Sequence, residues 1–181
     1  NNRLFVADSN NMRVLVFDTA VIANGENAVR VLGQANFTTR TIATTQAGMS
    51  TPLGVAFDAV NNRLFVADSD NRRALFTPAP AADTQSGRHS GAGASFGATN
   101  NRLFLVDWPN SRVLVFDTAT ITNGENAVNV LGQANFTSSH ILIVPTQAGL
   151  YHAFGVAFDP GSGRLFVTDS GNNRVMIFDV T

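Results

Sequence analysis

The chain has 181 residues, a length that suits a single domain, and 44% of them are apolar while only 14% are charged. This composition excludes a disordered charged tail. The 12 basic residues are all arginine and balance 13 acidic residues to a net charge of −1, which argues against a protein built to neutralise nucleic-acid phosphates. Cysteine is absent, which excludes disulfides and thiolate metal ligands, and no apolar run is long enough to span a membrane as a helix.

An internal repeat dominates the chain. The pattern Arg-Leu-Phe-x-x-Asp occurs four times, at residues 3–8, 63–68, 102–107 and 164–169. Each copy is followed, after a short polar segment, by a second apolar run, at residues 14–17, 74–76, 113–116 and 175–178. Runs of Val, Leu and Phe this short, separated by Gly, Asn, Asp and Thr, predict β-strands and turns rather than helices.

Two further elements complete the repeat. A run that begins with glycine precedes three of the copies, at residues 54–58, 93–97 and 155–159. An Asn-Gly-Glu-Asn-Ala-Val segment opens a fourth element, at residues 24–34 and 123–133. The runs are almost continuously apolar, which is typical of sheets covered on both faces. Four short antiparallel strands per repeat, stacked face to face, predict an all-β fold, a β-propeller with blades at about 1–40, 41–82, 83–140 and 141–181.

The pattern Arg-Leu-Phe-Val-Ala-Asp-Ser-x-Asn-x-Arg-Val-x-Val-Phe, with its Asn-Gly-Glu-Asn-Ala and Leu-Gly-Gln-Ala-Asn-Phe spacers, resembles the NHL repeat of bacterial β-propellers. The resemblance extends over almost the whole chain and implies a propeller fold. It does not select one function, because NHL-type propellers include protein-binding and RNA-binding modules, sensor ectodomains and some metal-dependent lyases.

The predicted blades are incomplete. The first lacks the glycine strand, the fourth ends after its third strand, and in the second Pro78 and Pro80 stand where a fourth strand is expected. Because proline cannot donate to a central ladder, we expect an irregular linker at residues 77–83 and an edge strand at residues 74–76. Three interpretations stay open: a fragment of a longer propeller, a chain whose open ends pair with other copies in an oligomer or filament, and a compact four-bladed unit.

The turn between the second and third strands of every blade carries the same polar residues, and we call these segments (residues 8–13, 68–73, 107–112 and 169–174) the Asp-Asn-Arg turns. The candidate binding residues are Asp8, Asn11, Arg13, Asp68, Asn71, Arg73, Asp107, Trp108, Asn110, Arg112, Asp169, Asn172 and Arg174. The Asp, Asn and Arg side chains can stabilise the turns themselves, and the turns together form one rim face of the kind that binds partners. Trp108 replaces the serine of the other turns, which predicts either an interface residue or packing over the adjacent turn.

No catalytic or metal-binding set emerges from the sequence. His89, His140 and His152 do not align as a repeated ligand set, and there is no Gly-x-Ser-x-Gly elbow. The two glutamates, Glu26 and Glu125, both fall in peripheral turns. We therefore expect no enzymatic activity and no cofactor.

The sequence favours a non-enzymatic binding or scaffold module that presents a loop face to a protein or a glycan. The alternative is a structural protein that assembles into oligomers or filaments through open blade edges, and a metal-dependent propeller lyase or lactonase ranks third. Nucleic acid is not expected as a partner. The absence of lysine and the many Asn and Thr residues suggest an exported bacterial protein, at the cell surface or outside the cell.

Overall fold

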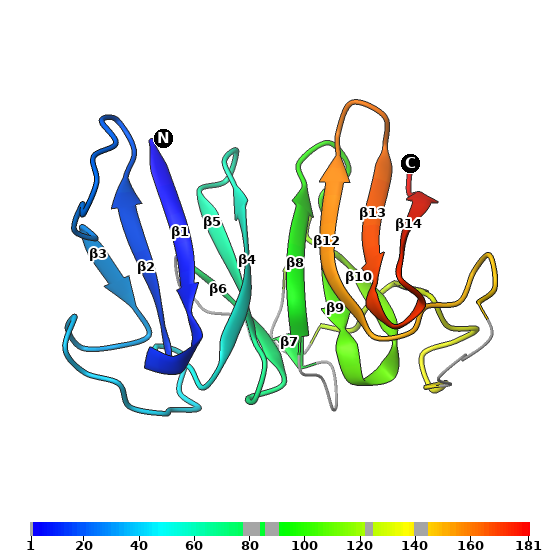
Figure 1. Cartoon of the computed structure of the whole chain (residues 1–181), viewed down its shortest axis with the longest axis horizontal. Helices are drawn as coiled ribbons and strands as arrows, with labels where there is room; N and C mark the ends of the chain where they lie inside the picture. The colour runs from blue at the N-terminus through cyan, green and yellow to red at the C-terminus, as the bar shows by residue number, and fades with distance from the viewer. Residues whose placement is uncertain (1, 78–83, 86–90, 122–124, 140–144) are drawn as a thin grey trace.

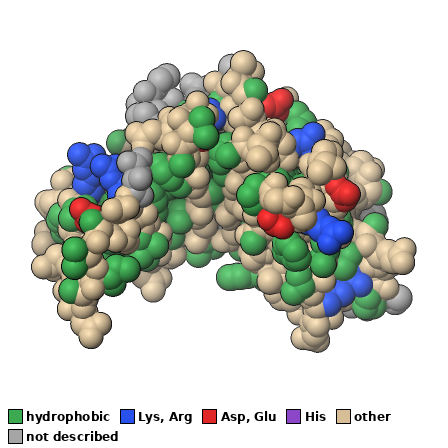
Figure 2. All heavy atoms as spheres, turned by 90° about the horizontal axis from the view of Figure 1, so that it is seen from above, with side chains coloured by type: hydrophobic (Ala, Val, Ile, Leu, Met, Phe, Trp, Pro, Cys, Tyr) green, Lys and Arg blue, Asp and Glu red, His purple; other side chains and the backbone are tan. Residues whose placement is uncertain are grey.

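The computed structural model of the chain describes residues 2–77, 84–85, 91–121, 125–139 and 145–181. Four antiparallel sheets stand side by side along an arc (Figure 1), and the view from above shows its hollowed side (Figure 2). Sheet 1 contains β1 (Arg3–Asp8), β2 (Arg13–Asp18) and β3 (Arg30–Leu32). Sheet 2 contains β4 (Pro52–Asp58), β5 (Arg63–Asp68), β6 (Arg73–Thr77) and β7 (Thr84–Gln85). Sheet 3 contains β8 (Gly91–Gly97), β9 (Arg102–Asp107), β10 (Arg112–Asp117) and β11 (Asn129–Leu131).

Sheet 4 contains β12 (Ala153–Asp159), β13 (Arg164–Asp169) and β14 (Arg174–Asp179). Single turns of 3₁₀ helix, η1 (Ser9–Asn11), η2 (Trp108–Asn110) and η3 (Ser170–Asn172), connect three of the central hairpins. No helix in the described part of the chain is long and apolar enough to cross a membrane.

The Arg-Leu-Phe segments form β1, β5, β9 and β13 over the predicted residues, and the all-β prediction is confirmed. Each of these strands pairs with the strand that follows it in the chain. Its last residue, an Asp, lies opposite the Arg that begins the following strand, as Asp68 does with Arg73. The glycine strands β4, β8 and β12 each begin two residues earlier than predicted, because a register shift near their start lets the extra residues rejoin the ladder.

One prediction about the second blade is wrong. Residues 74–76 were expected to form the edge of their sheet, but β6 pairs with β7, which is the edge strand. The expected boundary at residues 82 and 83 also assigned β7 to the third blade, whereas it belongs to sheet 2. Most of the predicted linker, residues 78–83, lies outside the described residues.

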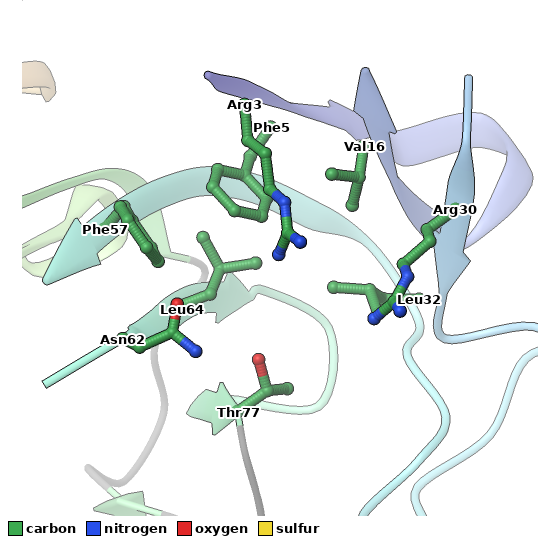
Figure 3. Close-up of a pocket in the computed structure, with 9 residues that line it drawn as sticks. All are labelled: Arg3, Phe5, Val16, Arg30, Leu32, Phe57, Asn62, Leu64 and Thr77. Carbon is green, nitrogen blue, oxygen red and sulfur yellow. The ribbon is translucent and has the colours of Figure 1, made fainter. Parts of the chain in front are cut away.

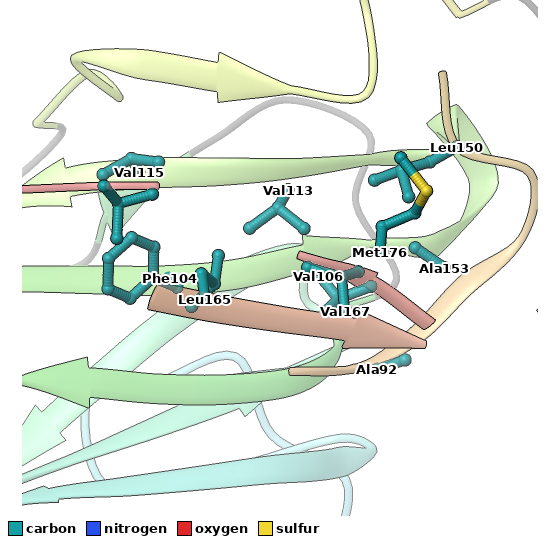
Figure 4. Close-up of a cluster of buried hydrophobic side chains, with 11 residues drawn as sticks. Ala92, Phe104, Val106, Val113, Val115, Leu150, Ala153, Leu165, Val167 and Met176 are labelled. Atoms are coloured by element: carbon teal, nitrogen blue, oxygen red, sulfur yellow. The ribbon is translucent and has the colours of Figure 1, made fainter. Parts of the chain in front are cut away.

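The core lies between the sheets. Sheets 3 and 4 enclose the largest cluster, in which Phe104 and Val106 of β9 face Leu165 and Val167 of β13 (Figure 4). Similar clusters lie between sheets 1 and 2, around Val66, and between sheets 2 and 3, around Phe65. Complete burial of one such side chain contributes about 1.5–3 kcal/mol, so the stacked interfaces supply most of the stability.

Neighbouring sheets pack through non-equivalent faces. Between sheets 2 and 3, the face of sheet 2 that carries the Phe of the Arg-Leu-Phe strand meets the face of sheet 3 that carries the Leu of that strand. The contributing residues of sheet 2 are Phe65, Ala67, Ala74 and Phe76, and those of sheet 3 are Leu103, Leu105, Leu114 and Phe116. Successive sheets therefore meet head to tail, as in a repeat protein whose units cannot bury their own faces alone.

The glycine strands lie side by side across the arc (Figure 1). A Cβ atom on Gly54 would lie 2.6 Å from the backbone N of Ala94, and one on Gly93 would lie 2.8 Å from the carbonyl O of Phe154. The repeated glycine is thus required by the close approach of the next strand. At Gly155, the last of the three, the Cβ would meet only the side chain of Thr168, at 3.3 Å.

Candidate functional site

Each Asp-Asn-Arg turn is closed by a network around its aspartate. The arginine Nε donates to Asp Oδ2 at 2.7, 2.9, 2.6 and 2.7 Å in the four turns, and the asparagine amide donates to the same carboxylate. The residue before each arginine takes the left-handed conformation, with φ between 51° and 55°, which reverses the chain. The pairs are Asp8–Arg13, Asp68–Arg73, Asp107–Arg112 and Asp169–Arg174.

The same arginines hold the long loops that join neighbouring sheets. Arg73 donates to the carbonyls of Thr44, Thr45 and Gly48, each at 2.8 Å, while Arg13 donates to the carbonyl of Phe37 from the preceding sheet. The loop between sheets 1 and 2 is therefore held from both sides.

The loop between sheets 3 and 4 repeats this arrangement. Arg174 donates to the carbonyls of Thr146 and Gly149 at 2.7 and 2.8 Å, and Arg112 donates to the carbonyl of Phe136. Because several charge-assisted bonds fix each loop, the side chains on this rim are carried by a rigid support.

The predicted site residues are thus brought together within each turn, but most are turned inward. Asp68, Asp107 and Asp169 are buried, and Asp68 and Asp169 also accept the backbone N–H groups of Ser50 and Tyr151, at 2.8 and 2.6 Å. The carboxylates and guanidinium groups bond within the protein. Of the thirteen predicted residues, Trp108 is the one that is exposed, and the other twelve are buried or half-buried.

Trp108 belongs to an aromatic stack that joins two sheets. Its side chain is 39% exposed and stacks on His152, with ring centroids 4.9 Å apart and an interplanar angle of 26°. The ring of Tyr151 also contacts His152, with ring centroids 4.3 Å apart. His152 has a left-handed backbone (φ 52°), and its N–H donates to Ser111 Oγ at 3.2 Å. The stacking confirms that Trp108 packs over an adjacent turn, and its exposure leaves the role as an interface residue a prediction.

Sequence reasoning missed the rest of this surface. Phe37 and Phe136, in the two Leu-Gly-Gln-Ala-Asn-Phe spacers, are exposed beside the same turns. A phenylalanine that recurs in a polar loop was the available signal. We call the set Phe37, Trp108, Phe136, Tyr151 and His152 the aromatic rim.

At the opposite rim, the hairpin that joins β4 and β5 contains a buried carboxylate, that of Asp58. Asp58 accepts hydrogen bonds from the side chain and N–H of Asn61 and from Arg63, with distances of 2.7 to 3.1 Å. Burial alone would raise the pKa of Asp58, but the bonds from Asn61 and Arg63 outweigh it and hold this pKa below its ordinary value.

This lowered pKa predicts an acid-sensitive contribution to stability. The ionised form of Asp58 stabilises the folded chain above the ordinary carboxyl pKa of about 3.9, and this contribution is lost as the pH falls through the lower folded value. The expected result is a fall in the free energy of unfolding below about pH 4, shallower in Asp58→Asn than in the unmodified protein. Urea titrations from pH 3 to pH 7 measure it, and parallel curves for both proteins would contradict the assignment.

Groups of three or more metal-ligating side chains do not occur among the residues that the structure describes. Two of the three histidines considered from the sequence, His89 and His140, lie outside those residues, and His152 is part of the aromatic stack.

No protein-family model matches the chain, and neither does any curated protein. Among solved structures, a chain of the crystal structure of a nidogen/laminin complex is similar, with a TM-score of 0.66 and 20% sequence identity. The match covers 99% of this chain and 56% of that β-propeller chain.

The fold is an incomplete β-propeller. This confirms the predicted fold class, and the chain spans a little over half of its structural neighbour. The four sheets are the blades, and the Asp-Asn-Arg turns lie together on one rim of the arc (Figure 1).

Proposed function

We propose that the chain is a non-enzymatic binding module that presents the aromatic rim to a protein partner. The observation that carries this proposal is the exposed Trp108–His152 stack, held on loops that buried Asp–Arg pairs fix in place. Aromatic side chains dominate the energetics of protein interfaces. A rigid support adds affinity because little conformational freedom is lost on binding. The structural neighbour was solved in a complex of two proteins, which supports a binding role in general.

The test compares proteins captured by the immobilised chain and by two variants. Trp108→Ser copies the serine found at this position in the other three turns, so the fold should accept it. Val60→Ser is the matched control, because Val60 is an exposed apolar residue on the opposite rim. We expect a partner that binds the unmodified chain and Val60→Ser but binds Trp108→Ser about 30-fold more weakly, as loss of a hot spot implies. Equal capture by all three would reject the proposal.

The same variants test a glycan partner. An aromatic face also stacks on sugar rings, and a glycan array probed with the three proteins would reveal binding that depends on Trp108. Glycan binding with no protein capture would replace the protein partner by a carbohydrate. Export from a bacterial cell remains part of the proposal and is tested by fractionating the source cells.

A second candidate function, association of chains end to end, rests on the two outer faces of the arc. Sheet 4 exposes Phe154, Val175 and Ile177, each more than half, and sheet 1 exposes Leu4 and Val6. The exposed residues of sheet 4 and sheet 1 include the equivalents of the sheet 2 and sheet 3 residues that pack together between those two sheets. The last face of one copy therefore fits the first face of another.

Light scattering over a concentration series tests this association. Head-to-tail contact predicts masses that rise with concentration above 19.2 kDa, and an Ile177→Asp variant that stays at that mass. A mass of 19.2 kDa at every concentration for both proteins would show that copies do not cover these faces.

A further inference from the structure

A cavity of about 230 Å³ lies between sheets 1 and 2, at the rim opposite the Asp-Asn-Arg turns (Figure 3). Its floor is apolar and includes Phe5 and Phe57, whose ring centroids are 5.0 Å apart. Arg3 and Arg30 enter it from sheet 1, and Asn62 and Thr77 point into it from sheet 2 (Figure 3). Two cations thus stand over an apolar floor, and none of the described lining residues carries a carboxylate.

The guanidinium groups of these two arginines face the cavity. Neither the Arg3 side chain nor the Arg30 side chain makes an ion pair or hydrogen bond with a residue that the structure describes. Asp18 supplies a negative charge opposite Arg3 on the neighbouring strand, but it makes no ion pair with Arg3 and does not line the cavity.

The second half of the chain provides an internal comparison. Phe104 and Phe158 stack between sheets 3 and 4, with centroids 5.5 Å apart, as Phe5 and Phe57 do between sheets 1 and 2. At the positions of Arg30 and Thr77, however, the second half has Asn129 and Phe178.

Phe178 packs against the core cluster between sheets 3 and 4. The half that has asparagine in place of the second arginine therefore has a packed phenyl ring at the position of Thr77, which lines the cavity in the first half. Cation and space occur together in one interface and are replaced together in the other, which indicates a ligand rather than a packing defect.

We propose that this cavity binds a carboxylate carried on a small apolar group. Arginine presents paired N–H donors that match a carboxylate, and both arginines are exposed, so a ligand can reach them. The phenylalanine floor accepts an aromatic or branched aliphatic body, and the volume admits a group about the size of a phenyl ring with a short chain. The carboxylate belongs either to a free acid or to the C-terminus of a peptide that ends in an apolar residue.

Calorimetric titration of the full chain with 3-phenylpropionate and with a tripeptide ending in Phe tests the proposal, each beside its amide. We expect the carboxylate of at least one pair to bind 10-fold or more tightly than its amide. Tighter binding of the peptide assigns the site to a chain terminus, and tighter binding of 3-phenylpropionate assigns it to a small molecule. Absence of binding, or equal binding of acid and amide, would overturn the proposal.

Three variants connect the binding to the cavity. Arg30→Asn and Thr77→Phe copy the residues that the second half already carries, so both should fold, which thermal unfolding checks. Each should abolish the preference for the acid. Arg40→Asn, which removes an exposed arginine from the loop between sheets 1 and 2, is the control and should bind as the unmodified chain does. Binding that survives in Arg30→Asn and Thr77→Phe would place the ligand elsewhere and overturn the assignment.

Discussion

Replacement of Gly93 by alanine is expected to lower the free energy of unfolding by about 3 kcal/mol, the upper end of the usual cost of overpacking. The added Cβ would lie 2.8 Å from the carbonyl O of Phe154 and 3.2 Å from the N of Val156. Both are backbone atoms of β12, so the clash cannot be relieved by a rotamer change and the two sheets must move apart. Equilibrium unfolding in urea measures the loss.

Gly155→Ala is the matched control for this prediction. It makes the same chemical change at the equivalent position of sheet 4, where the new Cβ meets only the Thr168 side chain at 3.3 Å. We expect a change below about 1 kcal/mol, because a side chain can shift where a backbone cannot. Equal losses in the two variants would show that the glycines serve their own strands rather than the approach of the next blade.

Replacement of Asp68 by alanine is expected to cost about 3–5 kcal/mol, the range for breaking a buried ion pair by removing one partner. Asp68 is fully buried and accepts bonds from Arg73 at 2.9 Å, from Asn71 at 2.7 Å and from the N–H of Ser50 at 2.8 Å. The variant leaves the Arg73 guanidinium buried without its counter-charge and releases one attachment of the loop between sheets 1 and 2.

Asp8→Ala makes the same change in the first turn, where the carboxylate is 23% exposed. Water can solvate Arg13 there, so a loss of about 1 kcal/mol or less is expected. Guanidinium titrations of both variants provide the comparison. A cost at Asp68 no larger than that at Asp8 would contradict the view that the buried turns fasten the rim.

The strands with a strong local pattern could be predicted from the sequence. An arginine begins and an aspartate ends each Arg-Leu-Phe strand, and these two residues meet the next strand at the turn, so the bounds of β1 and β9 agree with the structure. The two-residue strand β7 could not be predicted, since Thr84 and Gln85 form no apolar run and their pairing depends on the position of β6.

The candidate sites were harder to predict than the strands. The Asp-Asn-Arg turns were found, but burial is a property of the stacked sheets and is not visible in a turn motif. The stack on Trp108 needs His152, which lies just before the first strand of the neighbouring sheet. The cavity between sheets 1 and 2 left a weak signal, the exchange of Thr77 for Phe178 between two otherwise similar halves.

The most direct test of the proposed binding rim is the fluorescence of Trp108, which is the only tryptophan in the chain. The partner added in this experiment must lack tryptophan or contain a non-fluorescent tryptophan analogue. The emission then reports on the rim alone. If the partner covers the aromatic rim, the emission will shift to shorter wavelength and the shift will saturate with the binding isotherm. An emission spectrum that stays unchanged while the partner saturates the chain would contradict the account.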